Sequence, residues 1–229
     1  MDKLSENILL IDKPSDITSF DVIRILRRKL NIKKIGHAGT LDPAATGLLV
    51  IGVGAGTKEL NQYIKLDKEY EAEILIGESR TTGDMDGEVV ESVEVAGLTE
   101  EKVKQAVSEL IGAIELPVSA YSAIKKDGVP FYKKAFAAEK RGETIRKEDL
   151  PIREMKIHKA ELLKTHLCII NDTQKMVAEV RFEVGSGTYI RSLAEELGRK
   201  LGYPAVLKNL RRTKVGEFRI EEAVKLEDL

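Results

Sequence analysis

A glycine-rich segment with a single carboxylate constrains this chain most strongly. Residues 35–49 read Ile-Gly-His-Ala-Gly-Thr-Leu-Asp-Pro-Ala-Ala-Thr-Gly-Leu-Leu. The glycines allow backbone conformations that other residues avoid, and the small side chains bury little surface. Pro43 fixes its own φ and lacks an N–H, which disfavours a helix around Asp42. The segment therefore predicts a loop that presents Asp42, either as a catalytic carboxylate or as the first residue of an ordinary turn.

Composition bounds the class of protein. A chain of 229 residues can bury a sizeable core, as one large domain or two small ones. The single cysteine, Cys168, excludes an internal disulfide and fits a reducing compartment. The first residues show no signal-peptide pattern, and the longest apolar run, near 48–53, is too short to cross a membrane. We expect a soluble, cytoplasmic protein.

Charge is segregated along a chain whose net charge is only −1. Six basic residues and no acidic one lie between Asp21 and Asp42, and six more lie between Glu196 and Glu217. Residues 67–115 carry fourteen acidic residues and four basic ones. Either basic cluster alone is better explained as a solvated helix face. Two of them on a neutral chain favour a basic surface that binds a phosphate backbone.

Hydrophobic periodicity predicts three helices. Ser19 is expected to cap a helix over 20–30, and Thr99 a second helix. The third follows Gly187 and ends at Gly202, with a proline shortly afterwards. The apolar stripe expected in the second helix consists of Val103, Val107, Leu110 and Ile111.

Strands are predicted where apolar and polar residues alternate. Residues 69–76 form one such strand, with Tyr70 on its apolar face, and residues 176–184 form another. The helices are unevenly placed between strands, and no linker rich in proline, glycine or serine interrupts the chain. This pattern favours an α+β fold and a single domain.

The segment around Asp42 resembles the catalytic motif of the TruB family of tRNA pseudouridine synthases. Six further segments similar to this family follow one order along nearly the whole chain. They are Ile-Asp-Lys-Pro at 11–14 with Thr18-Ser19, Lys-Glu-Tyr at 68–70, Gly-Asp-Met-Asp-Gly at 83–87, Tyr-Ser-Ala-Ile-Lys at 121–125, Gly-Ser-Gly-Thr-Tyr-Ile-Arg at 185–191 and Asn-Leu-Arg-Arg-Thr at 209–213.

The resemblance implies a fold. It is the α+β pseudouridine-synthase fold, a central mixed and mostly antiparallel sheet flanked by helices and loops. We expect one catalytic domain over 1–229, a thumb-like RNA-binding insertion at about 122–150, and no C-terminal PUA-like domain. A surface helix explains the polar stretch 125–149 equally well without any function.

The resemblance also implies a reaction: uridine 55 in the T-loop of tRNA is flipped out and converted to pseudouridine. Asp42 is then the catalytic carboxylate, and it either attacks C1′ or removes the C2′ proton. Arg191 pairs with Asp42, and Asp84 joins this network, although its sequence is also ordinary turn chemistry. Tyr70 stacks on the flipped base and is the candidate for taking the C5 proton; without the resemblance it is a core residue.

Further residues are expected to contact the RNA by the same resemblance. His37 meets the RNA near the displaced base, and Tyr189 and Leu210 line the pocket. The basic members of the expected RNA-binding set are Lys13, Lys125, Arg211 and Arg212. No metal and no cofactor are expected. The expected partner is the T-arm stem-loop of tRNA, bound by a monomer with no membrane or protein partner.

Two positions depart from the family, and other functions stay open. Asp16 stands where a glycine is usual, which alters a turn, and Thr81 replaces a usual aspartate. A non-catalytic RNA-binding or tRNA-folding protein would keep the same fold. A glycosidase would need Asp42 and Asp84 as its two carboxylates. A pseudouridine synthase acting at another RNA position is the third alternative.

Overall fold

A computed structural model describes residues 7–119, 125–126, 129–141 and 149–229. These residues form two compact units, which are described separately. Unit 1 comprises the chain up to Glu71 together with Phe182–Ser186 and Asn209–Leu229, and unit 2 comprises Ala72–Arg181 and Gly187–Lys208. Three strands contribute residues to both units: β4 (Lys68–Ile76), β11 (Thr173–Val184) and β12 (Ala205–Val215).

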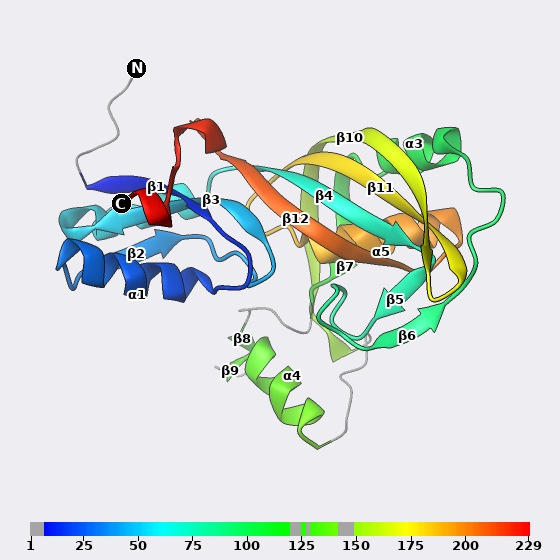
Figure 1. The fold of residues 1–229 in the computed structure, drawn as a ribbon, viewed down its shortest axis with the longest axis horizontal. Helices are drawn as coiled ribbons and strands as arrows, with labels where there is room; N and C mark the ends of the chain where they lie inside the picture. The colour runs from blue at the N-terminus through cyan, green and yellow to red at the C-terminus, as the bar shows by residue number, and fades with distance from the viewer. Residues whose placement is uncertain (1–6, 120–124, 127–128, 142–148) are drawn as a thin grey trace. The chain divides into compact units, whose positions relative to one another are not determined.

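Unit 1 contains the β14-β1-β3 part of a ten-stranded mixed sheet (Figure 1). Its strands are β1 (Ile8–Lys13), β2 (Ile35–Ala38), β3 (Thr46–Val53), β13 (Phe218–Arg219) and β14 (Val224–Lys225). Its helices are α1 (Ser19–Leu30), α2 (Leu60–Ile64) and three short 3₁₀ segments, η1 (Gly54–Lys58), η3 (Ile220–Glu222) and η4 (Leu226–Asp228). β3 pairs antiparallel with β1 and β2 and parallel with β12, which makes the sheet mixed.

Alternating side chains bury both faces of this sheet. Helix α1 covers one face, where its Val22 and Leu26 pack with Leu49 and Ile51 of β3. The other face of β3, with Leu48 and Val50, packs against α2 and the segment after β12. Because both faces are covered, β3 is buried along most of its length. The loop before β3 therefore ends at a rigid element.

The start of α1 differs from the expectation. Thr18, not Ser19, caps the helix: its hydroxyl accepts from the Asp21 N–H, and the Asp21 carboxylate accepts from the Thr18 N–H in return. This capping box satisfies two backbone donors at the helix end. Ser19 is therefore released from capping, and its side chain is buried against another segment.

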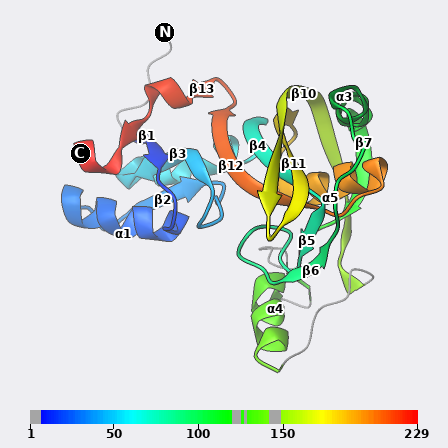
Figure 2. The same ribbon diagram turned by 45° about the vertical axis from the view of Figure 1, so that its right-hand side comes forward.

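Unit 2 packs helices against long strands (Figure 2). Its strands are β5 (Glu78–Arg80), β6 (Val89–Ser92), β7 (Gly112–Pro117), β8 (Lys125–Lys126), β9 (Val129–Pro130) and the nineteen-residue β10 (Ile152–Ile170). Its helices are α3 (Glu100–Ser108), α4 (Phe131–Glu139) and α5 (Ile190–Leu201). Helix α5 buries Leu193, Ala194 and Leu197 completely. Among the described residues, the main strands pair in the order β14-β1-β3-β12-β4-β11-β10-β7.

The α+β class with a mixed sheet is confirmed, as are the three predicted helices and the two predicted strands. One member of the predicted stripe is wrong: Ile111 lies beyond the end of α3 and is 48% exposed. In the expected thumb-like insertion, the described residues form the short β8–β9 pair and α4. Residues 121–124 of the family segment lie outside the described residues. The single domain over 1–229 and the lack of a PUA-like domain stay predictions.

Gly198 offers a test of packing in unit 2. A Cβ at this position of α5 would lie 2.5 Å from the Ala205 Cβ and 2.6 Å from the Tyr203 carbonyl oxygen. We expect Gly198→Ala to lower the free energy of unfolding by about 2–3 kcal/mol through overpacking, although alanine favours helices. Gly202→Ala is the matched control, because Gly202 has a φ of +76° with no heavy atom near its Cβ position. It should lose only about 1 kcal/mol, from left-handed strain.

Urea unfolding of the two variants beside the wild type measures both effects. A loss for Gly198→Ala that is no larger than that for Gly202→Ala would contradict the packing described for α5.

Candidate active site

The loop of residues 39–45, called here the Asp42 loop, is held on both sides of its carboxylate. Before Asp42, the Leu41 N–H donates to the buried Ser19 Oγ at 2.9 Å, and Ser19 Oγ lies 3.1 Å from the Leu41 carbonyl oxygen. After Asp42, the Ala45 N–H donates to the Asp42 carbonyl oxygen at 3.1 Å and closes a turn. Asp42 itself is half-buried. The loop therefore presents a carboxylate from a backbone that other groups hold in place.

Lys13 holds the same loop from the end of β1. Its side chain is fully buried, and its Nζ donates to the carbonyl oxygens of Pro14, Ile17 and Pro43 at 2.7–2.9 Å. Three acceptors match the three N–H groups of an ammonium. Burial lowers the pKa of Lys13 to about 8; the charges of Asp16 and Asp42 oppose this effect, and that of Arg212 adds to it. Lys13 is thus built to position the Asp42 loop, and the RNA contact expected of it stays a prediction.

Arg212 fastens the loop to β12. Its Nε donates to the Leu48 carbonyl oxygen at 2.7 Å and its Nη2 to the Gly39 carbonyl oxygen at 3.1 Å, with the side chain 1% exposed. Strands β3 and β12 approach closely at Gly47, which pairs with Arg212. Only glycine fits there, because φ is +103° and a Cβ would lie 2.3 Å from the Arg212 carbonyl oxygen. The RNA contact expected of Arg212 stays a prediction, and its observed contacts are with backbone carbonyls.

Asp16 keeps the turn that a glycine usually makes. Its φ is +67°, in the left-handed region, and its N–H donates to the Pro43 carbonyl oxygen at 3.0 Å. Aspartate is one of the few residues that adopt this conformation without a large penalty. The departure from the family therefore leaves the turn intact and adds a negative charge near Lys13.

Tyr70 lies on β4, with its side chain 8% exposed. The start of this strand is anchored by Lys68, whose Nζ donates to the carbonyl oxygens of Ile64 and Leu66 at 2.5 Å. Burial, with the charge of Arg212, lowers the pKa of Lys68 to about 8. Tyr70 thus sits on the apolar face predicted for it, at the fastened end of a strand.

His37 and the residues before Arg212 lie in the same unit. His37 is half-buried on β2, and among the described residues its Nδ1 has no hydrogen-bond partner. Burial, and secondly the charge of Arg212, lower the pKa of His37, while a backbone interaction with Gly39 opposes them, and the net shift favours the neutral imidazole. Leu210 is half-buried. Arg211 pairs with Asp12, its two terminal nitrogens lying 3.1 and 2.8 Å from the carboxylate oxygens. The side chain of Lys125 lies outside the described residues.

Unit 2 contributes an ion pair between two predicted site residues. Arg191, in the first turn of α5, places its Nη1 3.4 Å from Asp84 Oδ2 and donates from the same nitrogen to the Thr82 carbonyl oxygen at 3.2 Å. The Thr82 hydroxyl bonds Asp84 Oδ1, and the Asp86 N–H donates to that oxygen at 3.2 Å. Asp84 therefore serves both the turn and the ion pair. Arg191 is 7% exposed, so this pair is shielded from water.

Two other polar groups lie just before α5. Tyr189 precedes α5, and its N–H points to the Met155 sulfur at 3.5 Å. The Thr188 hydroxyl oxygen is buried and has no partner among the described residues. Sequence reasoning does not identify Ser19 and Thr82 as site residues. The Thr82-Gly-Asp84 spacing is a local hydroxyl–carboxylate turn that could have revealed Thr82, whereas Ser19 has the sequence position of a helix cap.

The described part of the chain offers neither a metal-binding cluster nor a membrane-spanning helix. No three His, Cys, Asp or Glu side chains gather there in an arrangement able to hold a metal ion. None of the helices described is both long and apolar enough to cross a membrane.

Comparison with known proteins places nearly the whole chain beside one enzyme family. Residues 27–190 match the family profile of the N-terminal domain of TruB family pseudouridylate synthases, and residues 191–229 match that of the tRNA pseudouridylate synthase B C-terminal domain. A tRNA pseudouridine synthase B from Corynebacterium diphtheriae is 41% identical over 225 residues, covering 97% of this chain and 71% of the relative. One from Opitutus terrae is 40% identical, covering 97% of this chain and 86% of the relative.

Solved structures show the same fold. A Cbf5-Nop10-Gar1 complex matches with a TM-score of 0.70 and 27% identity, covering 97% of this chain. An H/ACA RNP bound to a substrate RNA containing 2′-deoxyuridine matches with a TM-score of 0.66 and 26% identity. This chain spans about half the length of the chains it matches in these two structures, 53% and 52%.

The buried ammonium of Lys13 makes a prediction about pH. Its pKa is about 8 in the folded protein, against the ordinary lysine value of 10.5 that applies to the unfolded chain. Between these values the unfolded chain binds more protons, so this group makes the free energy of unfolding rise with pH. We expect the free energy of unfolding of the wild type minus that of Lys13→Met to increase from pH 8 upwards, by at most about 1.4 kcal/mol per pH unit.

Urea unfolding of both proteins at several pH values measures this difference. Lys68 is present in both proteins, so its own titration cancels in the subtraction. A difference that stays flat or falls above pH 8 would contradict the burial of a protonatable Lys13.

Proposed function

Because this chain belongs to the TruB family of pseudouridylate synthases, we propose that it converts uridine 55 in the T-loop of tRNA to pseudouridine. The observation that carries the proposal is the Asp42 loop, which presents one carboxylate from a backbone held by Ser19, Lys13 and Arg212. The names of the bacterial relatives support tRNA as the substrate, and the resemblance described above supports position 55. The proposal places the enzyme in the cytoplasm, acting as a monomer.

The proposed reaction is an isomerisation. The bond between N1 and C1′ breaks, the base turns while it is held in the site, and C5 bonds to C1′. The proton on C5 leaves and N1 gains one, so the composition of the RNA is unchanged. The uridine must first leave the base stack to reach a side chain on a protein loop. Asp42 acts at the sugar, either as the nucleophile at C1′ or as the base at C2′.

Arg191 supplies charge to this chemistry in our proposal. It pairs with the Asp42 carboxylate, favours its ionised form and orients it for the sugar. The Asp84 carboxylate and the Thr82 carbonyl oxygen support this role, because both fix Nη1 of Arg191 before any substrate binds. The same ion pair argues against Asp84 as the second carboxylate of a glycosidase, since a general acid must carry a proton.

The base is held by aromatic and neutral groups in this proposal. Tyr70 stacks on the flipped uracil and takes the C5 proton, directly or through water. His37 meets the RNA near the displaced base as a neutral imidazole, which can both donate and accept a hydrogen bond. Tyr189 and Leu210 line the pocket around the base.

Asp42→Asn is the direct test of the proposed chemistry. The amide keeps the size of the side chain but cannot act as nucleophile or base, so we expect the rate to fall by at least about a thousandfold. Pseudouridine formed on unmodified tRNA transcript is mapped by carbodiimide treatment and primer extension. The control is Asp172→Asn: this residue is exposed, has a φ of +57° that asparagine also adopts, and should leave the rate unchanged.

The outcomes separate the alternatives. A primer-extension stop at position 55 that Asp42→Asn abolishes supports both the reaction and the role of Asp42. A folded wild type that binds tRNA and forms no pseudouridine would favour a non-catalytic RNA-binding protein. Product at another uridine would keep the reaction and refute the proposed position.

A further inference from the structure

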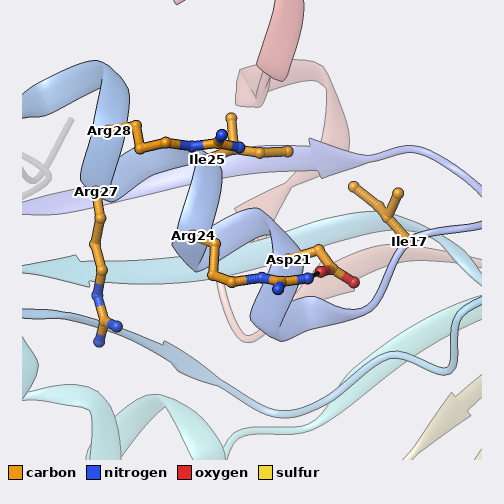
Figure 3. Close-up of a pocket in the computed structure, with 6 residues that line it drawn as sticks. All are labelled: Ile17, Asp21, Arg24, Ile25, Arg27 and Arg28. Atoms are coloured by element: carbon orange, nitrogen blue, oxygen red, sulfur yellow. Dashed lines mark ion pairs between the residues drawn. The ribbon is translucent and has the colours of Figure 1, made fainter.

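A groove runs over helix α1, outside the residues assigned to the reaction. Its volume is about 630 Å³. Figure 3 shows its side chains coming from α1 and from the segment just before it. The groove is lined by Ile17, Asp21, Arg24, Ile25, Arg27 and Arg28.

Positive charge dominates the groove. Its one carboxylate, Asp21, already pairs with Arg24 and accepts from the Thr18 N–H at 2.9 Å. Arg24 nevertheless keeps 63% of its side chain exposed. Arg28 is exposed and makes no ion pair or hydrogen bond with the residues that the structure describes. Two guanidinium groups one helical turn apart can therefore reach a ligand.

Arg27 has a different role on the same helix. Its Nη2 donates to the Ile35 carbonyl oxygen at 3.2 Å, and its guanidinium lies 5.8 Å from the centre of the Phe20 ring. In Figure 3 its side chain points away from Arg24 and Arg28. Arg27 thus fastens α1 to β2, which leaves Arg24 and Arg28 as the ligand-facing pair.

The groove begins where the Asp42 loop is attached. Lys13 Nζ joins the two directly, because it donates both to the carbonyl oxygen of the groove residue Ile17 and to that of Pro43. Ser19, the first residue of α1, binds Leu41 of the loop. A polymer bound with one unit at Asp42 therefore has α1 as a neighbouring surface within the same compact unit.

We propose that Arg24 and Arg28 bind backbone phosphates of the RNA whose uridine lies at Asp42, an inference that rests on the proposed function. The planar guanidinium fork matches two phosphate oxygens and loses little water on binding. Ile17 and Ile25, both partly exposed, add apolar surface to the same groove, against which the faces of ribose can pack. Because the net charge of the chain is only −1, its attraction to RNA must come from local basic surfaces such as this one.

The test removes both charges and follows affinity against salt. Arg24→Gln/Arg28→Gln and the wild type are titrated with unmodified tRNA transcript at several KCl concentrations by filter binding. We expect Kd to rise about tenfold near 0.1 M salt and the slope of log Kd against log salt to become shallower by about 2. The matched control is Lys102→Gln/Lys104→Gln, which removes two charges from exposed positions of α3 and should change Kd less than about twofold.

Each result decides the inference. A Kd and a salt slope equal to those of the wild type would overturn it. Binding of polyglutamate that the double variant loses, with tRNA binding unchanged, would assign the groove to an acidic protein and also overturn it. If the double variant fails to fold by circular dichroism, Arg28→Gln alone should make the slope shallower by about 1, and an unchanged slope would overturn the inference. Pseudouridine formation by the wild type is scored separately, so failure of the proposed function is distinguishable.

Discussion

The site in unit 1 depends on two buried cations that donate to backbone carbonyl oxygens. Lys13 and Arg212 have almost no exposed surface, and their donors fasten Pro43 on one side of Asp42 and Gly39 on the other. Burying a charge is costly unless hydrogen bonds replace water, and here the loop carbonyls supply them. The Pro43 carbonyl oxygen also accepts from the Asp16 N–H at 3.0 Å, so the loop backbone is fastened by a backbone donor as well. The buried cations and the backbone of the Asp42 loop therefore stabilise each other.

This arrangement also sets the electrostatics around the Asp42 carboxylate. Lys13, Lys68 and Arg212 are close enough that the charge of Arg212 lowers the pKa values of both lysines. The Asp42 charge in turn raises the pKa of Lys13. Cations fixed by backbone bonds need no reorganisation when charge develops in a reaction, which is the usual basis of electrostatic catalysis. In unit 2, Arg191 is fixed in the same way, by the Asp84 carboxylate and by the Thr82 carbonyl oxygen.

Local patterns in the sequence are sufficient to predict much of the fold. The alternation around Tyr70 and the glycine at 202 predict correct elements because each depends on neighbours in sequence. The long strand β10 is not predicted, since it is exposed along most of one face and shows little alternation. The role of Ser19 escapes prediction for a related reason: its partner, Leu41, is 22 residues away, and only the register of the fold brings them together.

The candidate site is predicted in residue type more fully than in geometry. Sequence resemblance picks Lys13 and Arg212 as basic residues that contact RNA, yet their charges are directed at backbone carbonyls. Charge alone does not distinguish a surface contact from a buried support, because burial follows from strands distant in sequence. Conversely, Asp16 is expected to alter a turn, and its left-handed φ shows that an aspartate preserves it. Backbone conformation decides that outcome, and the residue type alone does not.

We infer that the Asp42 loop is ordered in the free protein, and native-state amide hydrogen exchange tests this most directly. The amides of Leu41 and Ala45 donate hydrogen bonds within the site, so they should exchange with protection close to that of the β3 core. In Ser19→Ala the Leu41 amide loses its acceptor, and its protection should fall while that of β3 stays. Exchange of Leu41 and Ala45 in the wild type as fast as in an unstructured peptide would contradict the claim.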